Sequence, residues 1–340
     1  MEPPVRSTRP YLRLLAPVLA AGLVLTACGG SEEEPAETSS SAAAPAEEPL
    51  TWPLTGLEAA DGATVAKKHP PYIAKIDNTS NSAPQVGLGK ADLVVEELVE
   101  GGYTRLAVFF YQNLPTRVGP VRSMRATDVG IASPVDATII ASGAAQFTKN
   151  ALDQAGVKFI EEGAAGITRD PSRSSLYSVM ADLKAIGSTA KTKAARPADY
   201  FPWGDPADFP GTRKVGGITA DFGNHASEWA FRNGEYVLTN GYMAQGDAFN
   251  PQTLVVAQVR TSLAPYKDPG GNDVPISHFE GKGQAWVFHN GTMVRGTWEK
   301  DAPSAEVTFT TKDGKDLTIP AGKVWLELVP QQGGSVRTTP

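Results

Sequence analysis

Four arginines stand out in this 340-residue sequence because their type and spacing suit the binding of anions: Arg105, Arg117, Arg122 and Arg125. The last three lie within the short segment RVGPVRSMR. A guanidinium group carries a planar fork of N–H donors that matches the oxygens of a phosphate or a carboxylate. A helix predicted at 123–130 adds its free N–H groups and the positive end of its dipole. The pattern predicts an anion site for phosphate, pyrophosphate or carboxylate groups.

A second interpretation of the same arginines is structural. Four acidic side chains occur near them in the sequence, namely Glu96, Glu97, Glu100 and Asp128. Arginines paired with these carboxylates form salt bridges within the fold and bind no ligand. The chain is acidic, with a formal net charge of −6. This balance slightly favours the structural interpretation, and both interpretations stay open.

Signals for catalysis, metals and cofactors are weak. The chain has four histidines, at His69, His225, His278 and His289. They lack the HExxH spacing and cysteine partners, so no zinc site is expected. No phosphate-binding glycine motif and no G-x-S-x-G turn occurs, which argues against a nucleotide cofactor and a serine nucleophile. Asp221 and His225 lie four residues apart, but ordinary solvated polar residues explain this spacing best. We predict no catalytic residue, metal or cofactor, and we favour a non-enzyme.

The N-terminal segment predicts export and lipid attachment. A basic stretch precedes an apolar run at 14–25 that is too short to span a membrane and is typical of a signal peptide. The run ends in Leu25-Thr26-Ala27-Cys28, which resembles the lipobox of bacterial lipoproteins. We therefore predict a lipoprotein signal peptide at 1–27, cleavage between Ala27 and Cys28, and a diacylglycerol anchor on Cys28.

Residues 28–50 differ in composition from the rest of the chain. They are rich in Ser, Ala, Pro and Glu, and they contain six Glu but no Lys or Arg. Such a segment cannot bury enough apolar surface to fold, so it predicts a disordered acidic tether. Anchor and tether place the body at the outer face of the cytoplasmic membrane. Nucleic acid is not expected as a partner, because contact with phosphates relies on clustered Lys and Arg.

The body itself predicts an α+β protein of two domains. The first, at 51–195, alternates strand and helix patterns, as expected of a layered α/β domain. Its strands are predicted at 72–77, 91–98, 104–111 and 137–142, and its helices at 144–154 and 178–186. Residues 196–217 form a junction rich in Pro and Gly.

Turn residues dominate the second predicted domain, at 218–330. Asn233-Gly234, Asn290-Gly291 and Asp313-Gly314 each separate two β-rich segments. Asn-Gly and Asp-Gly favour two-residue hairpins because both central residues need a positive φ. Together with a final strand at 323–329, they predict a mostly antiparallel β domain. Residues 331–340 are predicted as a disordered tail.

Four motifs resemble one known family. The YerB-like bacterial lipoproteins contain stretches similar, in this order, to GLGKADLVVEELVEGGYTRLAVFF, VGPVRSMR, GKGQAWVFHNGTMVRGTWEK and DGKDLTIPAGKVWLELVP. The resemblance covers nearly all of residues 60–330 and implies a lipid-anchored, extracytoplasmic, two-domain protein with no assigned reaction. The chain departs from the family at Arg173-Ser174-Ser175-Leu176-Tyr177, where the family usually has Pro-His-Asn-Leu-Tyr after an Arg. Any role of that His or Asn is absent here.

Two functional hypotheses follow. In the first, the protein is a non-catalytic component of the cell envelope that recognises an anionic envelope component or an exported protein. The absence of a catalytic motif favours it. In the second, the protein is an envelope enzyme that acts on a phosphorylated or lipid-linked glycopolymer, with the arginine cluster stabilising developing negative charge. The layout of strand, Arg-bearing loop and helix is similar to that of the LytR-CpsA-Psr glycopolymer ligases, although their signature is not found.

Overall fold

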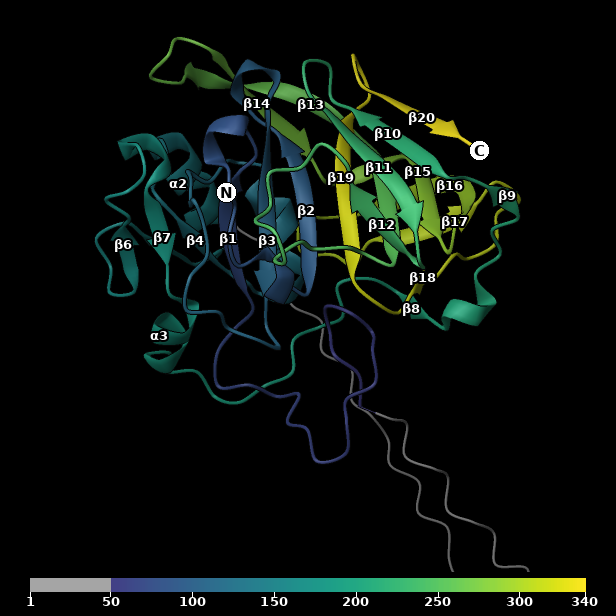
Figure 1. The fold of residues 1–340 in the computed structure, drawn as a ribbon, viewed down its shortest axis with the longest axis horizontal. Helices are drawn as coiled ribbons and strands as arrows, with labels where there is room; N and C mark the ends of the chain where they lie inside the picture. The colour runs from purple at the N-terminus through teal and green to yellow at the C-terminus, as the bar shows by residue number, and fades with distance from the viewer. Residues whose placement is uncertain (1–49) are drawn as a thin grey trace, which may run out of the picture. The chain divides into compact units, whose positions relative to one another are not determined.

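One twelve-stranded sheet runs through most of the computed structural model, which describes residues 50–340 (Figure 1). The predicted signal peptide, its cleavage site, the anchor at Cys28 and nearly all of the predicted tether lie outside the described residues. The strand order is β17-β16-β15-β13-β19-β2-β3-β1-β4-β5, with β14 paired to β13 and β9 paired to β16.

The strands of the large sheet come from both predicted domains. The first part of the chain supplies β1 (Tyr72–Asp77), β2 (Leu93–Leu98), β3 (Thr104–Phe110), β4 (Thr138–Ala141) and β5 (Phe159–Glu161). The second part supplies β9 (Arg213–Lys214), β13 (Thr253–Lys267), β14 (Asp273–His278), β15 (Gly281–His289), β16 (Thr292–Lys300), β17 (Thr308–Thr311) and β19 (Val324–Pro330). The strand predictions at 72–77, 91–98, 104–111, 137–142 and 323–329 are confirmed, with ends shifted by a few residues.

The two parts of the chain meet at β2 and β19. These strands pair in parallel, with Glu96 opposite Glu327, and β19 also pairs in parallel with β13. The junction at 196–217 therefore connects two parts of one sheet, and the described residues, 50–340, belong to one compact unit. All seven residues of β19 are buried, which fits a central strand covered on both faces. The predicted antiparallel arrangement is wrong for this strand, because its partners are distant in the sequence.

Alternation of side chains explains why both faces of the sheet are covered. On β3, Ala107 and Phe109 join one hydrophobic cluster, while Leu106, Val108 and Phe110 join the cluster on the other face. This is the two-residue period of a strand, with apolar residues at every position from Leu106 to Phe110. Both clusters extend from the first part of the chain into the second, so they hold the two parts together.

A second sheet of four strands packs on one face of the first (Figure 1). Its order is β12-β11-β10-β20, formed by β10 (Gly217–Asp221), β11 (Ala226–Arg232), β12 (Glu235–Leu238) and β20 (Ser335–Thr339). Trp229 on β11 meets Trp325 on β19 edge to face, with ring centroids 4.9 Å apart. The prediction of a disordered tail at 331–340 is wrong, because β20 satisfies the backbone groups along one edge of β10.

The helices are few and short, and the expected layering of helices on the N-terminal sheet is not confirmed. They are α1 (Asp128–Ala132), α2 (Gln146–Gln154) and α3 (Leu183–Ser188). The prediction at 144–154 is confirmed by α2. The one at 178–186 is partly wrong, because β7 (Val179–Ala181) pairs with β6 (Ile167–Arg169) and α3 begins only after its cap, Asp182. No helix within residues 50–340 is long and apolar enough to cross a membrane.

The hairpin predictions hold at two of three places. Asn233 and Asn290 both adopt a positive φ, at 53° and 46°, between paired strands. After Asp313-Gly314 the chain forms only a short bridge, and the next strand is the two-residue β18 (Ile319–Pro320), which pairs with β8 (Trp203–Gly204). Short 3-10 turns complete the fold at Ser80–Ser82, Leu88–Lys90, Glu100–Gly102, Ser133–Val135, Ser175–Tyr177 and Pro206–Asp208.

Candidate functional site

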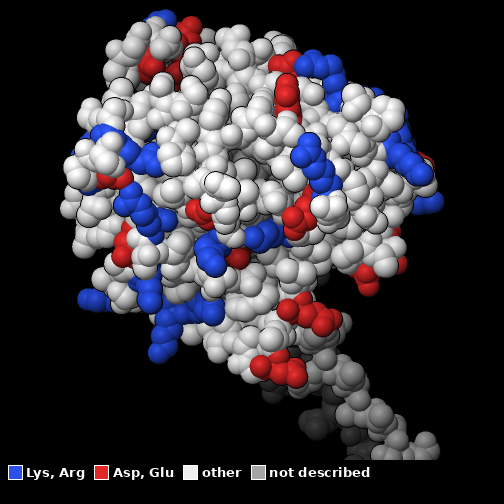
Figure 2. Space-filling view, in the orientation of Figure 1, with Lys and Arg blue, Asp and Glu red and all other residues white. Residues whose placement is uncertain are grey.

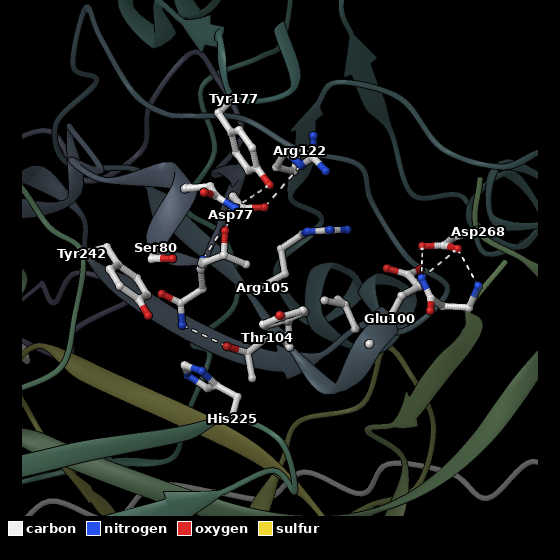
Figure 3. Close-up of a pocket in the computed structure, with 17 residues that line it drawn as sticks. Asp77, Ser80, Glu100, Thr104, Arg105, Arg122, Tyr177, His225, Tyr242 and Asp268 are labelled. Atoms are coloured by element: carbon white, nitrogen blue, oxygen red, sulfur yellow. Dashed lines mark hydrogen bonds and ion pairs between the residues drawn. The ribbon is translucent and has the colours of Figure 1, made fainter. Parts of the chain in front are cut away.

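A polar cleft of about 300 Å³ lies where the two parts of the chain meet (Figure 3). Asp77 is the last residue of β1 and lies opposite Arg105 at the start of β3. The antiparallel register therefore brings both side chains to the same edge of the sheet. The second part of the chain contributes His225, from the turn between β10 and β11, and Asp268, from the tip of the β13–β14 hairpin.

Arg105 is the cation with the fewest partners at this cleft. It is only 5% exposed. Its Nη1 donates a hydrogen bond to the carbonyl oxygen of Ser123 at 2.8 Å, and its Nε has no partner among residues 50–340. Burial lowers the pKa of Arg105 to about 10, so the side chain remains a cation at neutral pH. A buried cation without a paired carboxylate is costly unless something else compensates it.

Arg122 lines the same cleft but is already engaged. Its Nε lies 3.3 Å from Asp77 Oδ2, an ion pair without the geometry of a directed hydrogen bond. Its Nη1 donates to the carbonyl oxygen of Leu176 at 2.5 Å. The guanidinium also covers the ring of Tyr177, 5.2 Å from its centroid. Arg122 is therefore held in place by three neighbours and retains an exposed edge.

Arg125 is a structural residue at the border of the cleft. Its guanidinium forms a two-pronged pair with Glu100, in which Nη2 donates to Oε2 at 2.6 Å. Burial raises the pKa of the Glu100 carboxyl, but the Arg125 cation outweighs this effect and holds it below its ordinary value. The predicted helix at 123–130 begins only at Asp128. It is a single short turn, so the argument from a helix dipole does not apply.

Arg117 lies outside the cleft. More than half of its side chain is exposed, and it pairs with Asp170 next to a different hollow. Of the four predicted carboxylates, only Glu100 pairs with one of the four arginine side chains, because Glu97 and Asp128 both bind Lys75. The structure therefore brings together Arg105, Arg122 and Arg125, but it gives a carboxylate partner only to Arg122 and Arg125.

Two buried glutamates, Glu96 and Glu327, lie behind His225, and Glu96 contacts its ring. Glu96 and Glu327 lie side by side on β2 and β19, and neither is exposed. Burial and the neighbouring Glu96 carboxylate raise the pKa of Glu327 well above its ordinary value. Burial also raises the pKa of Glu96, but hydrogen bonding and the charge of His225 lower it to a net value below the ordinary one. The Glu327 carboxyl therefore holds its proton to a higher pH than the Glu96 carboxyl does.

Sequence reasoning missed several residues of this site. His225 was interpreted as a solvated polar residue, yet its Nε2 lies 3.3 Å from Glu96 Oε1. Asp77 enters the sequence analysis only as the last residue of the strand predicted at 72–77, and Tyr242 is not singled out there. No local pattern could have found them, because their partners are distant in the sequence. Within residues 50–340 no group of three or more His, Cys, Asp or Glu is arranged to hold a metal ion.

The charges on the surface do not give the molecule as a whole an attraction for anions. Figure 2 shows Lys and Arg interspersed with Asp and Glu over one face of the molecule. Because the whole chain carries a formal charge of −6, its long-range field does not favour anions. Any affinity for an anion must come from an enclosed site such as the cleft.

Comparison with known proteins assigns the family. The fold and the cleft define a class of protein in which an N-terminal and a C-terminal region of the chain contribute strands to one sheet. The models described as "Protein of unknown function (DUF3048) N-terminal domain" and "DUF3048 C-terminal domain" match residues 54–196 and 218–326. The chain belongs to the DUF3048 family.

Two comparisons with Bacillus subtilis agree with this assignment. The protein named "Putative lipoprotein YerB" in strain 168 is 25% identical over 302 residues, which cover 83% of this chain and 86% of that protein. The crystal structure of YerB from Bacillus subtilis has a TM-score of 0.70 and 22% identity, and the match covers 85% of this chain and 99% of that chain. The resemblance stated from the motifs is thereby confirmed.

Proposed function

We propose that this chain is a lipid-anchored extracytoplasmic protein that binds an anionic component of the cell envelope in the cleft. The ligand class is a phosphate- or carboxylate-bearing molecule. The observation that carries the proposal is Arg105, a buried cation that lines the cleft, has no carboxylate partner in the described part of the chain and keeps an unpartnered Nε. An anion that enters the cleft accepts hydrogen bonds from this guanidinium.

The proposal of a lipid anchor rests on Cys28 and its lipobox, and it agrees with the name of the Bacillus subtilis relative, a putative lipoprotein. Mass spectrometry of the protein from the membrane fraction tests it. We expect a mature N-terminus at Cys28 that carries a diacylglycerol group. An unmodified cysteine, or an N-terminus at another residue, contradicts the anchor but leaves the cleft argument intact.

Substitution of Arg105 tests the binding site. We expect Arg105→Met to weaken binding of inorganic phosphate about 10- to 100-fold, since a charge-assisted hydrogen bond contributes roughly 1.5–3 kcal/mol. Isothermal titration calorimetry on the full chain in detergent measures the affinity. The thermal midpoint is measured alongside the affinity, because the substitution also removes the attraction of the guanidinium to Glu100 and Asp77.

Arg117→Met is the matched control. Arg117 also belongs to the predicted cluster, but it lies outside the cleft and pairs with Asp170. We expect it to leave phosphate affinity unchanged. If Arg105→Met unfolds the protein and wild type binds no phosphate, the structural interpretation of the arginines holds and the proposed function is wrong.

A further inference from the structure

We propose that His225 is a second ligand-binding residue of the cleft and that the anion binds together with one proton, which resides on His225. This inference rests on the proposed function and deepens it. It names a second contact for an anion in the cleft, from the second part of the chain.

The position of His225 is set by a buried acceptor behind it. Its Nε2 lies 3.3 Å from Glu96 Oε1, and its side chain is 13% exposed at the cleft. Figure 3 shows His225 and Arg105 at the same cleft, approaching from different parts of the fold. The other ring nitrogen, Nδ1, has no hydrogen-bond partner among the described residues.

The charge of Glu96 determines which state of the ring binds an anion. Its two oxygens accept from Asn78 Nδ2 at 3.1 Å, from Ser227 Oγ at 3.0 and 2.9 Å, and from Trp325 Nε1 at 3.2 Å. These contacts suit an ionised carboxylate. Burial raises the pKa of Glu96, but the hydrogen bond and charge of His225 lower it on balance, which favours the ionised form. The Nε2 atom that faces this carboxylate must therefore carry its hydrogen.

The free nitrogen then changes role with protonation. When the ring is neutral and Nε2 carries the hydrogen, Nδ1 has only a lone pair and repels an anion. When the ring is protonated, Nδ1 becomes a donor and the imidazolium attracts the anion. Burial lowers the pKa of His225, but the hydrogen bond and charge of Glu96 outweigh this and raise it above its ordinary value of 6.5.

Other ionisable groups lie at the cleft and behind it. Those that line it with His225 are Asp77, Glu100, Tyr103, Arg105, Arg122, Tyr177, Tyr242 and Asp268, and Glu96 lies behind the ring. Asp77 is paired with Arg122, Glu100 is paired with Arg125, and Arg105 stays protonated because its pKa is about 10. Burial and the neighbouring Glu96 raise the pKa of Glu327 well above its ordinary value.

Sulfate is the probe for the test, because its charge does not change over this pH range. Calorimetry on the full chain in detergent, in two buffers of different ionisation enthalpy, measures affinity and proton uptake from pH 5.5 to 8.5. We expect sulfate affinity to fall about tenfold per pH unit above the pKa of His225, with uptake of about one proton, as linkage requires. Phosphate is unsuitable as the probe since it titrates itself.

Two variants separate His225 from the other histidines. His225→Gln retains a polar side chain that does not titrate, so sulfate affinity should become independent of pH. His278→Gln is the matched control, because His278 also contacts a carboxylate, Glu280, but does not line the cleft. We expect it to behave as wild type.

Each outcome decides between the two proposals. If wild type binds sulfate equally at all pH values while Arg105→Met weakens binding, this inference is wrong and the proposed function stands. The inference also fails if His225→Gln keeps the pH dependence of wild type. If wild type binds no sulfate or phosphate at any pH, both proposals are wrong.

Discussion

Replacing Lys75 with methionine should lower the free energy of unfolding by about 3–5 kcal/mol, the loss expected when one partner of a buried ion pair is removed. Lys75 Nζ lies 2.5 Å from Glu97 Oε1 and 2.6 Å from Asp128 Oδ1, and none of the three side chains is exposed. Without the ammonium group, two carboxylates remain buried beside each other. Urea denaturation at pH 7.5 measures the change.

The effect of this substitution should shrink at lower pH. Burial raises the pKa of Glu97, although the neighbouring Lys75 partly opposes this. Without Lys75 that opposition disappears, so acid neutralises the carboxyl more readily and relieves the repulsion. A loss of stability that is equal at pH 5 and pH 7.5 contradicts the electrostatic explanation.

Lys300→Met is the matched control for Lys75→Met. Lys300 is 1% exposed, and its Nζ donates to the carbonyl oxygens of Ala302, at 3.0 Å, and Pro303. It has no carboxylate partner in the described part of the chain, so its removal strands no negative charge. We expect a smaller loss, about 1–3 kcal/mol, for two unsatisfied acceptors. Equal losses in the two variants show that the carboxylates do not determine the effect.

Replacing Asp92 with asparagine should raise stability by about 3 kcal/mol at pH 8 and leave it nearly unchanged at pH 4. Asp92 is 3% exposed, and burial raises its pKa to about 6 from an ordinary value of 3.8. Its Oδ2 accepts from the backbone N–H groups of Tyr111 at 2.6 Å and Gln112 at 3.0 Å. Asparagine keeps an acceptor oxygen there and cannot ionise.

The direction of the pKa shift of Asp92 determines how stability changes with pH. A carboxyl whose pKa is raised on folding contributes stability that is present below its unfolded pKa, near 4, and lost as pH rises through about 6. Wild type therefore loses this contribution between pH 4 and 8, and the variant does not. Asp136→Asn serves as the control, because that side chain is 78% exposed. A pH-independent difference between Asp92→Asn and wild type overturns the prediction.

The strands and hairpins were predictable because their signals are local. The apolar run at 104–110 is a strand whatever it pairs with, and Asn290-Gly291 supplies the positive φ that a tight hairpin needs. Errors arose where pairing with a distant segment decided the outcome. Residues 335–339 have the composition of a polar tail, but they form a strand because they pair with the edge of β10. Residues 179–181 fit a helical pattern, but they form a strand because they pair with β6.

The candidate site was only partly predictable for the same reason. Charge and Gly/Pro spacing singled out Arg105, Arg122 and Arg125, but nothing local indicated which of them lacks a carboxylate. That depends on where Asp77 and Glu100 lie after folding. His225 lies 129 residues after Glu96 in the chain, so the contact that orients its ring has no sequence signature.

The sequence by itself identified the family and most of the strands. It also predicted the lipid attachment at Cys28 and an arginine-rich loop suited to anions. Those features depend on residue type, alternation and turn chemistry over a few neighbouring positions. Only the tertiary structure decided that β2 and β19 join both parts of the chain in one sheet. It also decided that Arg105 and His225 line the same cleft. The physical reason is that burial and ion pairing depend on which distant groups share a low-dielectric interior, and the chain order does not record this.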